Sequence, residues 1–294
     1  MKKLLSIIIL LAITLTTLSA CSSGGGKKLT IAGKSYTEAQ LTAEIMAQLL
    51  EEEGFSVERK FDMAGAICFE AIRKGDVDIY PEYTGGMVMA YLGQEIAPGT
   101  DADTTFQIAK EGFEREFDLI VLPDMGFNNT YANAISTDFA QANGIVTSSD
   151  LAAFSSQLVY GGEHAFFDRM DGYFNMCETY GYEFKKYVMM DVGLKQQSIK
   201  QGEIDVTNIY TTDGFLEGSG LTVLEDDLNF FPAYYCAPVV RKDVLEKYPE
   251  IEKALAVLDN CAKEENMIYY NSLVDNGKIS ISEAASLFIK ELLK

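Results

Sequence analysis

One sequence pattern occurs twice in the chain, 127 residues apart, and this repeat limits the folds that the chain can adopt. The first copy, residues 72–85, reads IRKGDVDIYPEYTG, and the second copy, residues 199–211, reads IKQGEIDVTNIYT. Without a gap, the copies align Gly75 with Gly202, Asp78 with Asp205, and Tyr83 with Tyr210. Each copy has the features of a helix end, a glycine stop, a short buried strand and a polar turn that carries a tyrosine.

A second match lies upstream of each copy. Residues 29–33 (LTIAG) and 158–162 (LVYGG) are both apolar runs that end in glycine, and they are 129 residues apart. We infer two similar α/β lobes from the two matches. Ligands of open α/β sheets bind beyond the carboxyl ends of the strands. A tyrosine that follows the same strand in both lobes therefore predicts a ligand pocket in the cleft between them.

Helix and strand patterns alternate along the chain and predict mostly parallel sheets. A capping box, Thr37 to Gln40, is expected to open the first helix. The predicted helices span residues 37–53, 64–74, 104–117 and 166–180, with more in 242–294, and the predicted strands span 55–61, 76–80, 119–122, 131–135, 158–160, 182–189, 204–208, 221–224 and 235–240. Two crossovers, 123–126 and 229–232, make a hinge. The predicted lobes are residues 29–125 plus 233–294, and residues 126–232.

The N-terminal residues have the pattern of an export signal. Two lysines precede an apolar run, and small residues then lead to Cys21. The sequence LSAC resembles the lipobox of bacterial lipoproteins, which implies that residues 1–20 are removed and that Cys21 carries lipid. Residues 21–28 then form a flexible tether to an extracytoplasmic domain. An N-terminal membrane helix is the alternative, although the run is short for it.

Composition excludes several classes of protein. With 294 residues and 48% hydrophobic content, the chain can build substantial cores. The net charge of −20 argues against binding to nucleic acid or to anionic lipid surfaces. No metal site or cofactor is predicted, because the cysteines lack C-x-x-C spacing and the acidic turns 101–103 and 225–227 lack the pattern of a calcium loop. The cysteines other than Cys21 can form disulfides outside the membrane, but their apolar surroundings favour free thiols.

Signatures of enzymes are mostly absent from the sequence. There is one histidine and no P-loop, H-E-x-x-H or G-x-S-x-G motif. His164 would have to act alone as a base in an enzyme for a choline-like substrate, and no nucleophile accompanies it. The sequence therefore predicts a binding protein with no catalytic residues.

Four tyrosines occupy comparable positions in turns or at strand ends. They are Tyr83, Tyr131, Tyr210 and Tyr234. An aromatic cage of this kind suits a quaternary ammonium group, which has no N–H to donate and is held by ring faces.

Four motifs carry a resemblance to a known family. These are YPEYTG at 80–85, GFNNTYA at 126–132, IYTTD at 209–213 and LEDDLNFFPAY at 224–234. They resemble the substrate-binding proteins of osmoprotectant ABC importers, which bind glycine betaine, carnitine or choline. The resemblance implies a two-lobed periplasmic-binding-protein fold with two crossovers, of the type II kind. It also implies a monomer that delivers its ligand to a membrane permease and its ATPase.

The resemblance also assigns roles to residues. Tyr83, Tyr131, Tyr210 and Tyr234 match the cage positions. Asn129 matches a position near the cationic head, and Lys34 and Arg169 match positions that hold a ligand carboxylate. A lysine and an arginine suit a zwitterion such as glycine betaine, proline betaine or carnitine better than choline.

One position departs from the family pattern. Several carboxylate binders have a threonine where this sequence has Gly86, which removes a hydroxyl donor and enlarges the pocket. The departure favours a bulkier ligand, such as carnitine, proline betaine or ergothioneine. A binder of choline and a sensor lipoprotein without a transport role are further alternatives.

Overall fold

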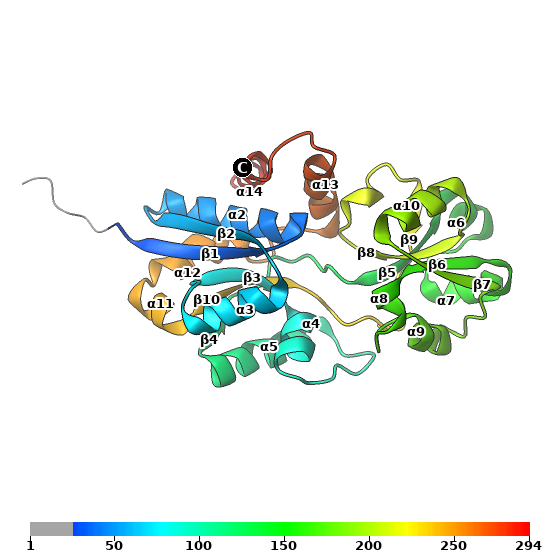
Figure 1. Ribbon diagram of the computed structural model, residues 1–294, viewed down its shortest axis with the longest axis horizontal. Coiled ribbons are helices and arrows are strands. Elements are labelled where there is room, and N and C mark those ends of the chain that lie inside the picture. Colours follow the sequence, from blue (N-terminus) through cyan, green and yellow to red (C-terminus); the bar gives the residue numbers. More distant parts are fainter. Residues whose placement is uncertain (1–25) are drawn as a thin grey trace, which may run out of the picture.

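The computed structural model describes residues 26–294 as two α/β lobes that lie side by side, as Figure 1 shows. The first lobe is built on a sheet of order β2-β1-β3-β10-β4, and the second on a sheet of order β7-β6-β8-β5-β9. The predicted α/β class is confirmed. The predicted signal peptide and the lipid attachment at Cys21 lie outside the described residues.

In the first sheet, β1 pairs in parallel with β2 and β3, whereas β10 runs antiparallel to β3 and β4. The chain thus leaves this lobe after β4 and returns to it as β10, between β3 and β4. The strands are β1 (Lys28–Lys34), β2 (Ser56–Met63), β3 (Ile79–Tyr83), β4 (Leu119–Val121) and β10 (Cys236–Arg241), and the helices among them are α2 (Thr37–Glu52), α3 (Gly65–Lys74), α4 (Thr84–Gly86) and α5 (Ala102–Phe117).

The second sheet has the same plan, since β6 pairs in parallel with β7 and β8, and β5 is antiparallel to β8 and β9. Each sheet therefore has one antiparallel strand inserted near its edge. The strands are β5 (Tyr131–Ser136), β6 (Val159–Glu163), β7 (Lys186–Met190), β8 (Val206–Tyr210) and β9 (Leu221–Val223), and the helices are α6 (Thr137–Asn143), α7 (Ser148–Leu151), α8 (His164–Phe167), α9 (Tyr173–Tyr180) and α10 (Val192–Gln201).

The predicted repeat is present as equivalent hydrogen bonds in the two lobes. In the first lobe, the Asp78 carboxylate accepts a hydrogen bond of 2.8 Å from the backbone N–H of Thr30. In the second, the Asp205 carboxylate accepts one of 2.8 Å from the N–H of Val159. Asp78 and Asp205 directly precede β3 and β8, so the two bonds join the start of β3 to β1 and the start of β8 to β6. The repeat thus sets the register of both sheets.

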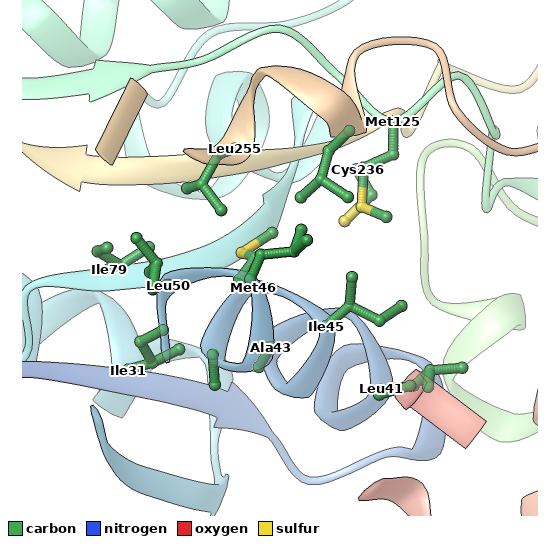
Figure 2. Packing of buried hydrophobic residues seen from close by; sticks show 14 of the residues in the cluster. Ile31, Leu41, Ala43, Ile45, Met46, Leu50, Ile79, Met125, Cys236 and Leu255 are labelled. Atoms are coloured by element: carbon green, nitrogen blue, oxygen red, sulfur yellow. The ribbon is translucent and has the colours of Figure 1, made fainter. Parts of the chain in front are cut away.

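The core of the first lobe surrounds α2, as Figure 2 shows. Leu41, Ile45, Met46 and Leu50 of this helix are fully buried. They pack between the sheet and the C-terminal helices, which are α11 (Lys242–Lys247), α12 (Glu250–Leu255), α13 (Glu264–Asp275) and α14 (Ile281–Leu292). Each buried side chain of this size contributes about 1.5–3 kcal/mol of transfer free energy. The prediction that the C-terminal helices return to the first lobe is confirmed.

The predicted helix over residues 166–180 is wrong, because the chain forms two helices, α8 and α9, separated by residues 168–172. Gly172 allows this break. A Cβ at Gly172 would lie 1.9 Å from the carbonyl oxygen of Phe166, so the chain turns back on itself more closely than any other residue permits. The turn carries Arg169 to the cleft between the lobes.

Two other local predictions need correction. The capping box at Thr37 to Gln40 is absent, because Tyr36 precedes α2 without a capping side chain and the Thr37 hydroxyl donates to Asp275 instead. Strand β3 begins at Ile79, three residues later than predicted, so that Tyr83 ends the strand rather than following it. Cys68, Cys177, Cys236 and Cys261 are free thiols, as their apolar surroundings predicted.

The two segments that join the lobes, residues 122–130 and 224–235, contain the predicted crossovers and lie against each other. The Asn129 N–H donates to the Tyr234 carbonyl at 3.0 Å, and the Tyr234 N–H donates to the Asn128 side chain at 2.7 Å. The residue boundaries assigned to the two lobes stay a prediction. Within residues 26–294, no helix has both the length and the apolar character needed to cross a membrane.

Candidate ligand-binding site

A cavity of about 590 Å³ lies between the lobes and is lined by residues of both. Its volume is typical of sites for small organic ligands, which range from about 300 to 1,000 Å³. All of the predicted ligand-binding residues line it, namely Lys34, Tyr83, Asn129, Tyr131, Arg169, Tyr210 and Tyr234. The fold therefore brings together residues that are up to 200 positions apart in the sequence. Their contact with a ligand stays a prediction.

Tyr131 and Tyr210 form one wall of the cavity. They stand opposite each other on the antiparallel strands β5 and β8, where side chains of paired residues share a face. Their rings are stacked, with centroids 4.7 Å apart, and their hydroxyl groups are 2.8 Å apart. Burial raises the pKa of both phenols above the ordinary value. Both rings are therefore neutral at physiological pH.

Tyr83 and Tyr234 come from the first lobe and from the second crossover. Tyr83 is 4% exposed, and its hydroxyl donates to the Glu38 carboxylate at 2.7 Å. The Tyr234 ring lies close to Gly85, where a Cβ would be 2.9 Å from ring atoms. Gly85 therefore makes room for this ring. Burial raises the pKa of Tyr234 to about 12.

Lys34 and Arg169 each have an acidic partner within the protein. Lys34 forms an ion pair with the buried Glu82. Arg169 binds Asp171 through Nε and Nη2, both at 2.6 Å, and Nη2 also donates to the Tyr234 hydroxyl at 3.2 Å. Among the described residues, Arg169 Nη1 donates no hydrogen bond. Both cationic side chains are thus held in place, and each retains N–H donors that are available to a ligand.

Asn129 faces an acid that the sequence analysis missed. Its amide Nδ2 donates to Glu38 Oε1 at 2.7 Å. Glu38 is 3% exposed and also accepts hydrogen bonds from Tyr83 and, at 3.0 Å, from Asn271. Burial raises the pKa of Glu38, although these hydrogen bonds oppose the shift. The segment that contains Glu38 did stand out in the sequence, but it was interpreted as a capping box and not as part of the site.

Other lining residues also went unrecognised. Tyr36 is 41% exposed and has its ring centroid 6.3 Å from that of Tyr83. Asn271 and Asp275 belong to α13, far from every motif in the sequence. The remaining ones include Thr37, Glu82, Val192, Gln196, Thr212, Asp213 and Gly214. The part of the site contributed by α13 had no sequence signal.

Gly86 lines the cavity and His164 does not. A Cβ at Gly86 would meet only Glu82 Oε1, at an ordinary 3.5 Å, so glycine there leaves space that a side chain is able to fill. His164 is exposed at the start of α8 and is not among the described residues that line the cavity. The enzyme alternative that relied on His164 as a base has no support in this arrangement.

Residues 27–291 match the family described as the substrate-binding domain of ABC-type glycine betaine transport systems. The chain belongs to this family. The resemblance inferred from the four motifs is thus confirmed, and this binding protein is the substrate-binding component of a betaine- or carnitine-type ABC importer. Such proteins act outside the cytoplasm, together with a membrane permease.

Individual relatives agree with this assignment. A protein of Helicobacter pylori (strain G27), named ergothioneine transport permease/ergothioneine binding protein EgtU, is 35% identical over 90% of the binding protein and 48% of its own length. The chain therefore spans about half of that relative. The carnitine transport binding protein OpuCC of Listeria monocytogenes is 31% identical over 99% of this chain and 97% of its own. Both are named for transport, in agreement with the prediction that the chain is not an enzyme.

The solved structures support the fold. A crystal structure described as a glycine betaine/carnitine/choline ABC transporter superposes on the binding protein with a TM-score of 0.85 and 26% identity, covering 90% of this chain and 97% of the other. The predicted periplasmic-binding-protein fold is confirmed.

Proposed function

We propose that the protein captures a quaternary-ammonium zwitterion in the cavity between its lobes and delivers it to an ABC importer. The observation that carries this proposal is that four tyrosines from separate segments line one cavity, with two cations beside them. The ligands that fit are glycine betaine, proline betaine and carnitine.

The tyrosines Tyr83, Tyr131, Tyr210 and Tyr234 hold the ammonium group. A quaternary ammonium ion is attracted to the faces of neutral aromatic rings, at about 0.5–2 kcal/mol for each ring. Burial supports this role because it raises the pKa of the phenols and so keeps them protonated. Several rings together give a favourable free energy large enough for binding in the micromolar range.

Lys34 and Arg169 hold the carboxylate of the ligand. Arg169 keeps Nη1 available while Asp171 occupies Nε and Nη2. The Lys34 ammonium has three donors, one of which is used by Glu82. A ligand carboxylate therefore shares these cations with the internal acids and does not displace them. Choline has no carboxylate and gains nothing from this end of the cavity.

Ergothioneine, a zwitterion that also carries ring N–H groups, is the second candidate. Asn271 Oδ1 and Glu82 Oε2 are buried and accept no hydrogen bond from any residue between 26 and 294. Both residues line the cavity, but these two oxygens lie beneath its surface, so a ligand with N–H donors reaches them only if the side chains turn toward it. The space beside Gly86 and the name of the Helicobacter pylori relative favour the same ligand.

The protein is a monomer that is held on the outer side of the cell membrane by lipid attached to Cys21. The LSAC sequence at 18–21 supports this anchor. Cys21→Ser is expected to release the protein from the membrane fraction of an expressing bacterium, as followed by immunoblotting. Membrane retention equal to that of wild type would contradict the lipid anchor.

Titration calorimetry tests the proposed ligand. Protein from Lys27 onward, unfolded and refolded to remove carried-over ligand, is titrated with glycine betaine, proline betaine, carnitine, choline and ergothioneine. The proposal expects a zwitterion to bind at micromolar concentration or tighter, and choline to bind more weakly. If choline binds best, the result would support the tyrosine cage and refute the proposal that Lys34 and Arg169 hold a ligand carboxylate. No heat from any of the five compounds would overturn the proposed function.

A further inference from the structure

Glu38 joins several parts of the site through one carboxylate group. It lies in the first turn of α2 and lines the cavity. Oε1 accepts hydrogen bonds from the Tyr83 hydroxyl and from Asn129 Nδ2, both at 2.7 Å. Oε2 accepts one from Asn271 Nδ2 at 3.0 Å, and the same Nδ2 donates to the Thr212 carbonyl at 2.9 Å. A strand end, a crossover, α13 and the second lobe thus meet at this group.

No cation neutralises this carboxylate within the part of the chain that the structure describes. Glu82, the other deeply buried acid of the cavity, is paired with Lys34. The ion pairs of residues 26–294 include none to Glu38. Burial of an unpaired carboxylate is costly even when it is hydrogen-bonded. A positive charge brought into the cavity would reduce that cost.

The carboxylate also decides which atoms its neighbours can offer to a ligand. The hydroxyl hydrogen of Tyr83 and one of the two Nδ2 hydrogens of Asn129 are directed to Glu38, so neither hydrogen is available to a ligand. Asn129 Oδ1 is left as a buried acceptor without a partner among the described residues. An amide oxygen carries partial negative charge and suits a cation that has no hydrogen to donate.

We propose that Glu38 is the buried counter-charge of the ligand's ammonium group, and that it positions Tyr83 and Asn129 from behind the tyrosine cage. This inference rests on the proposed function. The charge acts through the ring and the amide without touching the ligand. Its effect is large because opposite charges attract more strongly in a cavity of low dielectric constant than in water.

The test compares ligands that differ only in charge. Glycine betaine and 3,3-dimethylbutanoate have nearly the same shape, but a neutral carbon replaces the ammonium nitrogen in the second. Choline and 3,3-dimethylbutan-1-ol form an equivalent pair. Affinities of all four for wild type and for Glu38→Gln are measured by calorimetry. Glutamine keeps the size and one acceptor oxygen of Glu38 and removes the charge.

The proposal expects Glu38→Gln to weaken binding of glycine betaine and of choline by about tenfold or more, and not to weaken binding of either analogue that lacks the ammonium charge. Glu52→Gln is the matched control, because Glu52 is an exposed acid near the C-terminal end of the same helix. It should leave all four affinities unchanged. Thermal unfolding of both variants verifies that they are folded.

Two outcomes would overturn the counter-charge. Equal weakening of the ammonium ligands and of their analogues without the ammonium charge would make Glu38 purely structural, and unchanged affinity for the ammonium ligands would remove Glu38 from the site. Neither outcome affects the proposed function, which fails only if wild type binds no quaternary ammonium compound.

Discussion

The hydroxyl groups of Tyr131 and Tyr210 lie 2.8 Å apart across the antiparallel pair of β5 and β8, and their rings are stacked with centroids at 4.7 Å. The second lobe thus presents two rings as one aromatic surface. Because Tyr210 belongs to the sequence repeat, its counterpart in the first lobe is Tyr83, which lines the same cavity. The repeat therefore supplies an aromatic ring from each lobe.

Loss of a ring from either lobe should weaken ligand binding without unfolding the protein. Tyr83→Ala and Tyr210→Ala are each expected to cost about 1–3 kcal/mol of binding free energy. Tyr210→Phe should cost much less, because the ring face remains. Tyr269→Ala removes a tyrosine that is 49% exposed on α13 and serves as the control. Unchanged calorimetric affinity in both alanine variants would mean that the cage is misplaced.

Arg169 should discriminate between zwitterions and choline. Arg169→Met removes the free Nη1 donor. It is expected to weaken the binding of glycine betaine or carnitine by about 1.5–3 kcal/mol, the usual range for a hydrogen bond to a charged group. Choline should lose far less. Competition binding against both ligand types measures the difference. A loss of the same size for choline would assign Arg169 to support of the Tyr131 ring, 5.4 Å from the guanidinium group, and not to the carboxylate.

Gly86 should determine how large a ligand the cavity admits. Gly86→Thr is compatible with the fold, because the backbone there is helical, with φ −64° and ψ −41°, and the nearest atom to a Cβ is 3.5 Å away. The variant is expected to bind carnitine and ergothioneine at least about tenfold more weakly, while glycine betaine is unaffected or gains from the new hydroxyl. In Gly85→Ala, by contrast, the new Cβ would lie 2.9 Å from the Tyr234 ring and displace it, so binding of every ligand should weaken. Equal affinities of Gly86→Thr and wild type for the bulky ligands would refute this role.

Cation binding should weaken at acidic pH. Burial raises the pKa of Glu38 above the usual carboxyl value of about 4.3. A bound cation favours the ionised form and lowers this pKa again, so the added affinity is complete above the pKa of the ligand-free protein and declines as the pH falls below that value toward the lower pKa of the complex. Calorimetry at a series of decreasing pH values, starting from neutral pH, should record the loss in wild type and a flatter profile in Glu38→Gln.

Other titratable or charged groups around Glu38 must be separated from this effect. They are Lys34, Tyr36, Glu82, Tyr83, Asp213, Cys236 and Asp275. Asp213 matters most as a control, since burial also raises its pKa. If the pH dependence disappears in Asp213→Asn and persists in Glu38→Gln, Asp213 is the group that titrates.

The helix α2 should dominate the stability of the first lobe. Leu50 is fully buried between the sheet and the C-terminal helices, and Leu50→Ala is expected to lower the free energy of unfolding by about 2–5 kcal/mol. Ile67→Ala, at a side chain that is 56% exposed, should change it by less than about 0.5 kcal/mol. Urea unfolding followed by circular dichroism compares the two, and similar losses would contradict the proposed core.

Sequence patterns predicted the lobes and the tyrosines because those features are local. Gly75 and Gly202 end helices, and the aspartates and tyrosines that follow keep a fixed spacing from them. Glu38 was misjudged because a Thr-x-x-Gln spacing suits a helix cap, and only tertiary contacts direct the glutamate inward. Asn271 reaches the cavity on a helix more than 200 residues later, where no short pattern records its neighbours.

The pairing of the two crossovers has a thermodynamic consequence. Asn129 and Tyr234 are hydrogen-bonded to each other on the two segments that join the lobes, and both line the ligand cavity. Any movement of one lobe against the other at these segments would therefore alter the geometry of the site itself. The affinity measured for a ligand then contains the free energy of reaching the binding-competent conformation, in addition to the contacts. Substitutions in the crossovers can consequently change affinity by shifting that equilibrium while every group that touches the ligand remains the same.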